Sequence, residues 1–339
     1  MSAAVRAALA SVVEGRELDA DVMGAAMDAI LGGDAMPAQI AGLAIALRMR
    51  GETTTEIVAA VRALRRAASP LPIPAGTALL DTCGTGGDGL GTFNVSTVVA
   101  MVAAAAGAKV AKHGNRAISS RAGSADVLEA LGVRIDLSPE RAVEVLDEVG
   151  ITFLFAPAHH SALRHAASVR RELGVRTFFN LLGPLANPAH ATHQLLGLYD
   201  GARLRATAEV LAQLGVVRAA VVHGEGGLDE IAPSGVTRVA WLEDGAVREA
   251  TLTPADFGVD EAPIEAMLGG DAQENAHIAR AILEGEPGPR RAMVVINAGA
   301  ALVVAGLASS PREGAELAAR TIDEGRAMAL LDRWIEATR

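Results

Sequence analysis

The chain has 339 residues, of which half are hydrophobic and only 3% are aromatic, and its formal net charge is -10. The net negative charge argues against a general nucleic-acid binder, because such a protein needs a basic surface. No segment has the roughly 20 apolar residues of a membrane helix. We therefore expect neither a nucleic-acid nor a membrane partner. The single cysteine, Cys83, excludes an internal disulfide, and the N-terminus lacks a signal-peptide pattern, so we expect a cytoplasmic protein.

The first seventy residues are predicted to be helical. Apolar residues recur with helical spacing over 22–30, and a second helical run extends over 37–49. Thr53 and Glu56 form a capping-box pattern that predicts the start of a third helix. The proline-rich stretch 70–74 then interrupts regular structure, which predicts a domain boundary there.

Strands and helices alternate along most of the remaining chain. Short apolar runs at 77–83 and 109–111 are predicted strands, as are those at 151–155, 195–199 and 217–223. Alternation with helices of ten residues or more indicates parallel βαβ units, so we predict an α/β fold with a small N-terminal helical domain and a larger α/β domain around a mostly parallel sheet. The expected domains are a helical domain of residues 1–72, on which a helical insertion of about 160–190 packs, and an α/β domain of residues 73–159 and 191–339.

The sharpest motif is DTCGTGGDG, residues 81–89, which follows a predicted strand and precedes a predicted helix. Glycines in such a turn let backbone N–H groups approach phosphate oxygens. The loop also matches the G-x-G-x-x-G pattern of dinucleotide-binding dehydrogenases. Three features argue against that alternative: residues 90–94 separate the glycines from the helix, Asp88 would face a pyrophosphate, and the second strand is expected to end at Lys112 instead of at an acid. A cofactor with a 2′-phosphate can use a lysine, so the alternative stays open at this point.

Two polar clusters follow the next predicted elements. Residues 94–97 place amide and hydroxyl groups at a helix start, where they also fit simple N-capping. Residues 112–120, KHGNRAISS, place charge and hydroxyl groups after the second strand. Ligands of open α/β sheets bind beyond the carboxyl ends of the strands, so the clusters and the glycine-rich motif together indicate a highly phosphorylated ligand. Lys109 and Lys112 are the only lysines, which indicates that a compact point charge is needed there.

Asp229 and Glu230 follow the strand that is expected to end at His223. Adjacent acids in a loop are usually only solvated, but magnesium favours few protein carboxylates together with substrate phosphates and water. Ser96 can add a hydroxyl ligand. We therefore predict a Mg²⁺ cofactor that is held by Ser96, Asp229 and Glu230.

Four segments resemble the anthranilate phosphoribosyltransferase family in their order and spacing: GTGGDGLGTFNVST, KHGNRAISS, VRRELGVRTFFNLLGPLANP and GLDE. The resemblance spans nearly the whole chain, whereas GTGGD alone is shared with pyrimidine nucleoside phosphorylases. It implies a nucleoside phosphorylase/phosphoribosyltransferase-like fold, usually in a homodimer. It also implies transfer of the 5-phosphoribosyl group from phosphoribosyl pyrophosphate to the amine of anthranilate, giving N-(5-phosphoribosyl)anthranilate and pyrophosphate, in tryptophan biosynthesis.

The resemblance further implies roles for individual residues. Anthranilate would contact Gly84, Asn115 and Arg170, with the guanidinium of Arg170 paired to the substrate carboxylate. Lys112 and the loop that follows it would close on the phosphoribosyl pyrophosphate. The residues expected to bind phosphoribosyl pyrophosphate are Gly84, Gly87, Asp88, Thr92, Asn94, Val95, Ser96, Thr97, Lys112, His113, Gly114, Asn115, Arg116, Ala117, Ile118, Ser119, Ser120 and Ser124.

One segment departs from the family pattern. Where the family often has His-Pro-Ala-Met-Lys, this chain has HSALR at 160–164, which borders the expected anthranilate access route. Three alternative functions remain: a pyrimidine nucleoside phosphorylase would consume phosphate and thymidine, a dehydrogenase would bind a nicotinamide cofactor, and a non-catalytic nucleic-acid-binding relative would need a basic groove. For the transferase we expect catalysis by positioning and leaving-group stabilisation, because the anthranilate amine is already neutral at pH 7.

Overall fold

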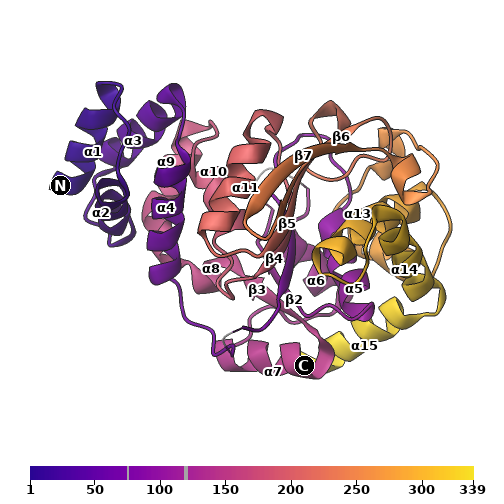
Figure 1. The fold of residues 1–339 in the computed structure, drawn as a ribbon. Helices are drawn as coiled ribbons and strands as arrows, with labels where there is room; N and C mark the ends of the chain where they lie inside the picture. Colours follow the sequence, from indigo (N-terminus) through magenta and orange to yellow (C-terminus); the bar gives the residue numbers. More distant parts are fainter. Residues whose placement is uncertain (75, 118–120) are drawn as a thin grey trace.

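The computed structural model describes residues 1–74, 76–117 and 121–339. Ile118, Ser119 and Ser120, which belong to the expected phosphoribosyl pyrophosphate site, lie outside the described residues. The N-terminal helices stand at one side of a central sheet, and the C-terminal helices cover the other side (Figure 1). Within the described ranges, no helix is long and apolar enough to cross a membrane.

Four helices form the N-terminal part of the chain. The capping box predicted at Thr53 and Glu56 is present, with the Thr53 N–H donating to Glu56 Oε2 at 2.9 Å and the Glu56 N–H donating to Thr53 Oγ1 at 3.3 Å. Glu56 is fully buried and also accepts the Leu18 N–H at 2.8 Å, so this cap ties the helix to the preceding turns. The four helices are α1 (Ala3–Val13), α2 (Ala20–Leu31), α3 (Pro37–Arg50) and α4 (Thr54–Arg66).

The central sheet has seven strands in the order β3-β2-β1-β4-β5-β6-β7. The first five in chain order pair in parallel, and the last two add an antiparallel hairpin at one edge, so the predicted mostly parallel sheet is confirmed. Parallel strands end at a common edge, which gathers the loops that follow them. The strands are β1 (Leu80–Gly84), β2 (Val110–Gly114), β3 (Ile151–Phe155), β4 (His193–Gly197), β5 (Arg218–His223), β6 (Thr237–Glu243) and β7 (Ala246–Leu252).

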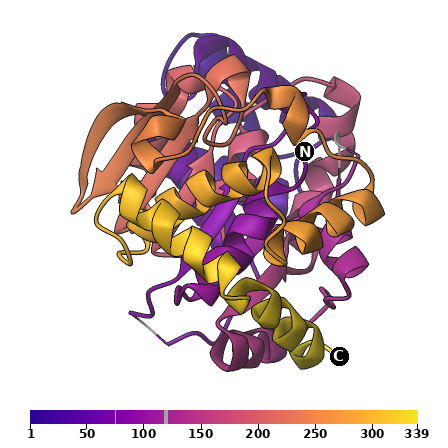
Figure 2. The same cartoon turned by 90° about the vertical axis from the view of Figure 1, so that its right-hand side faces the viewer.

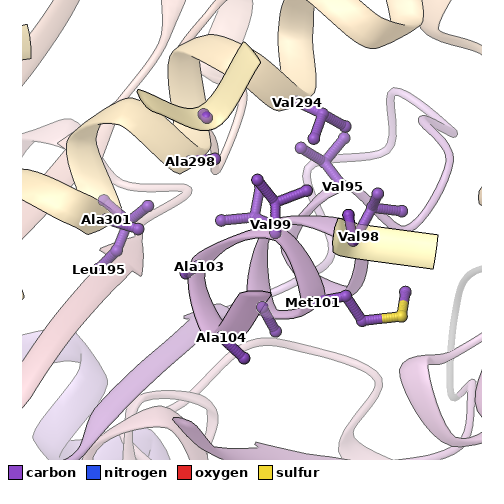
Figure 3. Packing of buried hydrophobic residues seen from close by; sticks show 14 of the residues in the cluster. Val95, Val98, Val99, Met101, Ala103, Ala104, Leu195, Val294, Ala298 and Ala301 are labelled. Carbon is purple, nitrogen blue, oxygen red and sulfur yellow. The ribbon is translucent and has the colours of Figure 1, made fainter. Parts of the chain in front are cut away.

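One apolar cluster fills the space between the sheet and the C-terminal helices, which face the viewer in Figure 2. Figure 3 shows its centre, where Val294 lies beside Val95 and Ala301 lies beside Leu195. Small aliphatic side chains let the two helices that carry Val95 and Val294 approach the sheet closely, as expected for a chain with few aromatics. The helices on this side are α5 (Val95–Ala105), α6 (Ser124–Leu131), α7 (Pro139–Val149), α12 (Ala272–Leu283), α13 (Pro289–Val304), α14 (Pro311–Asp323) and α15 (Arg326–Ala337).

A second apolar cluster joins the N-terminal helices, the segment between β3 and β4, and the opposite face of the sheet. Ala166 and Phe178 from that segment are buried in it together with Leu43 of α3 and Leu198 after β4. The chain therefore returns to the N-terminal helices before it completes the sheet. The helices of this cluster that follow β3 are α9 (Arg164–Leu173), α10 (Phe179–Leu185) and α11 (Leu204–Gln213), and the short helix α8 (Ala156–His159) directly follows β3 without joining the cluster.

The second strand is longer than its apolar run predicts. We expected its apolar run over 109–111 and its end at Lys112, but β2 pairs in register with β3 from Val110 to Gly114, so the strand continues through His113 to Gly114. Lys112 is 1% exposed, and hydropathy does not reveal a charged side chain inside a buried strand. The paired-lysine interpretation is wrong for Lys109, which is exposed and forms an ion pair with Asp147 at 2.9 Å.

Candidate functional site

Two loops meet at the carboxyl edge of the parallel strands. We call residues 84–91, after β1, the glycine loop and residues 228–232, after β5, the acid turn. The Gly86 N–H donates to Asp229 Oδ2 at 2.6 Å, which ties the two together. The Thr85 N–H donates to the Gly197 carbonyl at 2.9 Å, so the glycine loop is also fixed to β4. The glycine loop and the acid turn therefore form one site, as the sequence interpretation required.

Two glycines make this meeting possible. A Cβ atom at Gly84 would lie 2.3 Å from Asp229 Oδ2, and one at Gly197 would lie 1.5 Å from the Asp229 carbonyl oxygen. Both separations are far below van der Waals contact, and the second is to backbone, which cannot move away cheaply. Gly84 is therefore required where β1 ends, because Asp229 occupies the space of a side chain.

Lys112 supplies the buried positive charge of the site. Its Nζ donates to the Thr82 carbonyl at 2.5 Å and to Ser96 Oγ at 3.3 Å. Burial lowers the pKa of Lys112, whereas the charges of Asp81 and Glu230 act in the opposite direction. The ammonium thus points across the strand ends toward the first turn of α5, which contains Ser96.

Three carboxylates gather opposite this lysine. Burial and the charge of Asp88 raise the pKa of Asp229 to about 7. Burial and the charge of Asp229 raise the pKa of Glu230 well above its usual value, while Lys112 opposes this rise. Asp88 Oδ2 is buried without a hydrogen-bond partner. Acids that repel one another around an unsatisfied oxygen fit a bound cation.

The residues fit magnesium rather than a metal held by protein alone. Among the described residues, no group of three or more His, Cys, Asp or Glu side chains could hold a metal ion. Magnesium needs fewer protein ligands because substrate phosphates and water complete its coordination. Ser96 lies at the same place, since its N–H donates to Glu230 and its hydroxyl accepts from Lys112.

The start of α5 lies beside the glycine loop. Thr97 is 1% exposed, and its Oγ1 has no hydrogen-bond partner. The side chain of Asn94 is already engaged, because Oδ1 accepts from Asn275 Nδ2 at 2.8 Å and Nδ2 donates to the Ala122 carbonyl at 3.1 Å. Thr92 bridges to Leu268, which anchors the end of the glycine loop. Val95 is buried in the apolar cluster, so only its main chain can face a ligand.

The expected residues after β2 are only partly directed at the site. Arg116 forms ion pairs with Asp126 at 3.0 Å and with Glu129 at 2.5 Å, both on α6. The Ala117 N–H donates to Asp126 Oδ2 at 2.9 Å, and Ser124 Oγ donates to the Asn115 carbonyl at 3.3 Å. Both the Arg116 side chain and the main chain of Asn115 and Ala117 are therefore tied to α6. A Cβ at Gly114 would lie 2.2 Å from Ser124 Oγ, which explains the glycine there.

Arg170, on α9, is the cation that the resemblance implies for the anthranilate carboxylate. Its guanidinium carbon lies 5.8 Å from the ring centroid of Phe179, and burial lowers its pKa. Over the described residues, no hydrogen bond or ion pair to Arg170 is present. A half-buried guanidinium without an acid partner fits an anionic ligand group.

Two buried histidines meet where the sheet contacts the segment that departs from the family pattern: His113 belongs to β2, and His160 is the first residue of that segment. The rings of His113 and His160 meet edge to face, with centroids 5.2 Å apart. Burial lowers the pKa of His113 to about 3 and that of His160 to about 4, so both rings are neutral at pH 7. His113 Nδ1 lies 3.1 Å from the Gly183 carbonyl, which assigns the proton to this nitrogen and leaves Nε2 as a buried acceptor without a partner.

Sequence reasoning missed two residues that support the site, Asp81 and Arg176. Asp81, fully buried, accepts the His113 N–H at 3.1 Å and Asn187 Nδ2 at 2.8 Å. Arg176 donates to the Gly87 carbonyl and lies 3.9 Å above the ring of Tyr199. A charged residue in an apolar strand was the available signal for Asp81, whereas nothing in the local sequence connects Arg176 with the glycine loop.

Comparisons with known proteins agree with the fold. A family model described as the a/b domain of a glycosyl transferase family matches residues 76–328, and a second, described as the helical bundle domain of a glycosyl transferase family, matches residues 6–68. Together they match most of the chain, from the N-terminal helices through the sheet to the start of α15. The architecture that the sequence predicted, a helical bundle with a larger α/β part, is therefore confirmed.

Individual relatives are more specific. The anthranilate phosphoribosyltransferase of Myxococcus xanthus is 54% identical over 333 residues, which cover 98% of each chain. The crystal structure of the enzyme of that name from Thermus thermophilus has a TM-score of 0.93 at 47% identity and covers 98% of this chain and 99% of its own. The structure of the anthranilate phosphoribosyltransferase from Saccharomyces cerevisiae in complex with PRPP and Mg has a TM-score of 0.90 at 26% identity. The match covers 100% of this chain and 98% of the yeast chain. The chain belongs to the anthranilate phosphoribosyltransferase family.

Proposed function

We propose that the protein transfers the 5-phosphoribosyl group from phosphoribosyl pyrophosphate to the amine of anthranilate, releasing pyrophosphate, as a step of tryptophan biosynthesis. The observation that carries the proposal is a charge pattern. A buried lysine and three mutually repelling acids gather at the glycine loop, which itself carries one of the acids, Asp88, and an arginine without an acid partner in the described part of the chain stands on α9. The lysine and the three acids fit a metal-bound pyrophosphate, and the arginine fits the carboxylate of a small molecule.

The donor binds along the glycine loop and the start of α5 in this proposal. Backbone N–H groups of Gly87 and Asp88 contact its phosphates, as do the main chain at Asn94 and Val95 and the hydroxyl of Thr97, whose Oγ1 is buried without another partner. Lys112 stabilises the negative charge that develops on the pyrophosphate as the bond to the anomeric carbon breaks. Its two acceptors, Thr82 and Ser96, hold the ammonium in place before the substrate arrives.

Magnesium is the proposed cofactor, held by Ser96, Asp229 and Glu230 together with the substrate's phosphates. When bound, it neutralises the phosphate oxygens of the leaving group. The unsatisfied Oδ2 of Asp88 and the raised pKa values of Asp229 and Glu230 support a cation at this position. The acids' own contribution is to fix where the pyrophosphate end of the donor lies.

On the acceptor side, Arg170 pairs with the anthranilate carboxylate in the proposed complex, and Gly84 and Asn115 contact the same substrate. The neutral His113 offers Nε2 as a hydrogen-bond acceptor for the amine. Because the amine is neutral, the protein needs to orient its lone pair rather than remove a proton before attack. We therefore propose direct displacement through an oxocarbenium-like state without a covalent enzyme intermediate.

The test is the loss of anthranilate fluorescence when phosphoribosyl pyrophosphate is added, with and without Mg²⁺. We expect loss only when both are present. Unchanged fluorescence, together with phosphorolysis of thymidine in a parallel assay, would transfer the assignment to a pyrimidine nucleoside phosphorylase. Trapping a ribosylated side chain would disprove direct displacement.

We also propose that the protein acts in the cytoplasm as a homodimer. Its helical domain then consists of residues 1–72 and about 160–190, and its α/β domain consists of residues 73–159 and 191–339. Exposed apolar side chains on the N-terminal helices, Val13 and Met49 among them, support an association surface there. Light scattering of the purified protein measures the mass directly. A mass of one chain at micromolar concentration would contradict the homodimer.

A further inference from the structure

The acid turn is supported by a polar side chain from α13, a helix whose other residues over 292–304 are all apolar or glycine. Asn297 lies in the middle of α13, and it is the only polar side chain in the segment 292–307. Its side chain is fully buried, at 0% exposed. An amide is stable in such surroundings only when its hydrogen-bonding atoms have partners. The hydrogen bonds of Asn297 therefore indicate the role of its side chain.

Asn297 holds both main-chain polar groups of one residue. Its Oδ1 accepts the Ile231 N–H at 2.9 Å, and its Nδ2 donates to the Ile231 carbonyl at 3.1 Å. A third bond, from Nδ2 to the Met293 carbonyl at 3.0 Å, fixes the amide to its own helix. Ile231 directly follows Asp229 and Glu230, so these contacts determine the path of the main chain that carries the two acids.

The helix that carries Asn297 is itself rigidly placed. A Cβ atom at Gly299 would lie 2.7 Å from the Ala315 nitrogen, and one at Gly314 would lie 2.3 Å from the Gly299 carbonyl oxygen. The backbones of α13 and α14 therefore touch, which leaves α13 little freedom to shift. Farther along the acid turn, the Ala232 N–H donates to Thr237 Oγ1 at 2.9 Å, but this bond lies one residue beyond Ile231.

We propose that Asn297 is a positioning residue that holds Ile231 so that the carboxylates of Asp229 and Glu230 stand together at the carboxyl edge of the sheet. The inference rests on the proposed function, since it assumes that these acids hold magnesium. Asn297 touches neither substrate nor metal; it opposes the repulsion that would otherwise separate the acids before a cation binds. Ligating carboxylates need such outer partners to keep their geometry.

The experiment measures metal binding directly. Mn²⁺ serves as a paramagnetic probe, and electron paramagnetic resonance reports the free ion during titration of the protein with and without phosphoribosyl pyrophosphate. Asn297→Leu removes all three hydrogen bonds at similar volume, and Asn297→Ala leaves room for a water molecule that can pair with Ile231. The matched control is Thr321→Val, which deletes a fully buried hydroxyl of α14 that donates to the Leu317 carbonyl of its own helix.

In Asn297→Leu we expect the Kd of Mn²⁺ with phosphoribosyl pyrophosphate present to rise about 10- to 100-fold, the range typical for loss of an outer partner of a metal ligand. Asn297→Ala should show a smaller rise in the same direction, because water replaces part of the contact. In Thr321→Val the Kd should stay within about twofold even though thermal stability falls. The KM for anthranilate should be unchanged in all three.

Each other outcome has a definite meaning. Unchanged Mn²⁺ affinity in Asn297→Leu would overturn the inference and leave the proposed function intact. An equal loss in Thr321→Val would show that the affinity follows general stability and would also overturn it. If Asn297→Leu does not fold, the same two comparisons are made with Asn297→Ala: its Mn²⁺ affinity against that of the unmodified protein and against that of Thr321→Val. If the unmodified protein shows no Mn²⁺ binding that depends on phosphoribosyl pyrophosphate, the metal part of the proposed function fails instead.

Discussion

Lys112 is a buried cation and Arg170 a half-buried one, and their surroundings in the structure differ. The Lys112 ammonium, on a central strand, already donates to Thr82 and Ser96 and faces the charges of Asp81 and Glu230. The Arg170 guanidinium, on a helix of the segment between β3 and β4, has only the ring of Phe179 beside it within the described part of the chain.

The difference indicates how far the donor side and the acceptor side of the site are organised before their substrates bind. On the donor side the charges are placed in advance by the sheet, so a phosphorylated substrate meets an organised set of groups and little rearrangement is needed. On the acceptor side one charge lacks a partner among the described residues until a carboxylate arrives, and the energy of that pairing becomes available for binding. Variants on the two sides should therefore affect different kinetic constants.

The largest effect is expected for Lys112→Met. Removing a preorganised charge that acts on the leaving group should lower kcat/KM for phosphoribosyl pyrophosphate about 10²- to 10³-fold, with little change in the KM for anthranilate. Lys112→Arg should not restore activity, because a planar guanidinium does not fit a site that is 1% exposed. Lys109→Gln is the control, since Lys109 is exposed and pairs with Asp147. Full activity of Lys112→Arg would show that any positive charge suffices.

Arg170→Ala should have the next largest effect, on the acceptor alone. Loss of a charge-assisted pair of roughly 1.5–3 kcal/mol predicts a rise of about 10- to 100-fold in the KM for anthranilate. The KM for phosphoribosyl pyrophosphate should stay within about twofold of its parent value. Initial rates at varied concentrations of both substrates measure this, with Arg171→Ala, an exposed neighbour on α9, as the control. Equal changes in both KM values would contradict the separation of the two sides.

A smaller effect is expected from pH on metal affinity. Burial and Asp88 raise the pKa of Asp229 to about 7, so its carboxylate carries a proton below that pH. A cation competes with this proton, and Mn²⁺ affinity should therefore fall about tenfold between pH 8 and pH 6. Titrations at three pH values test this, and Asp229→Asn should bind more weakly with a flatter pH profile. A flat profile in the unmodified protein would contradict the assignment.

The smallest effect concerns stability on the acceptor side. The pKa of His160 is lowered to about 4 by burial, from about 6.5 in the unfolded chain, so between these values the unfolded state binds more protons than the folded one. Stability is therefore lost as pH falls through 6.5, by about 1 kcal/mol from this residue between pH 6.5 and 5.5. Urea unfolding of His160→Gln should show a correspondingly weaker pH dependence, whereas His277→Gln, an exposed control, should not. The same dependence in both variants would rule out His160 as its source.

The elements with a clear period or cap could be predicted from the sequence. The run 151–155 coincides with β3, and the capping box at Thr53 starts α4 where expected. The glycine-rich motif and the acid pair could be assigned to one edge of the sheet because parallel strands end together. These features are local, or follow from topology alone, so neighbouring residues contain the necessary information.

Contacts between distant segments could not be predicted in this way. The Arg116 side chain is taken up by acids ten and thirteen residues away, on a helix whose orientation the loop sequence does not specify. Asn94 is similarly engaged by Asn275, which is 181 residues away in the chain. Polar side chains choose among many possible partners, and only the folded arrangement determines which of them are within hydrogen-bond distance.

The sequence by itself determined the class of fold, the order of the phosphate-binding and acidic motifs, and the likeness to one enzyme family, because these depend on periodicity, turn chemistry and motif spacing. Only the tertiary structure decided that Lys112 lies inside a strand, that Asp229 fills the space a side chain at Gly84 would need, and that Asn297 holds the acid turn from α13. These facts depend on close packing between segments far apart in the chain, and packing is a property of the assembled core and not of any one segment.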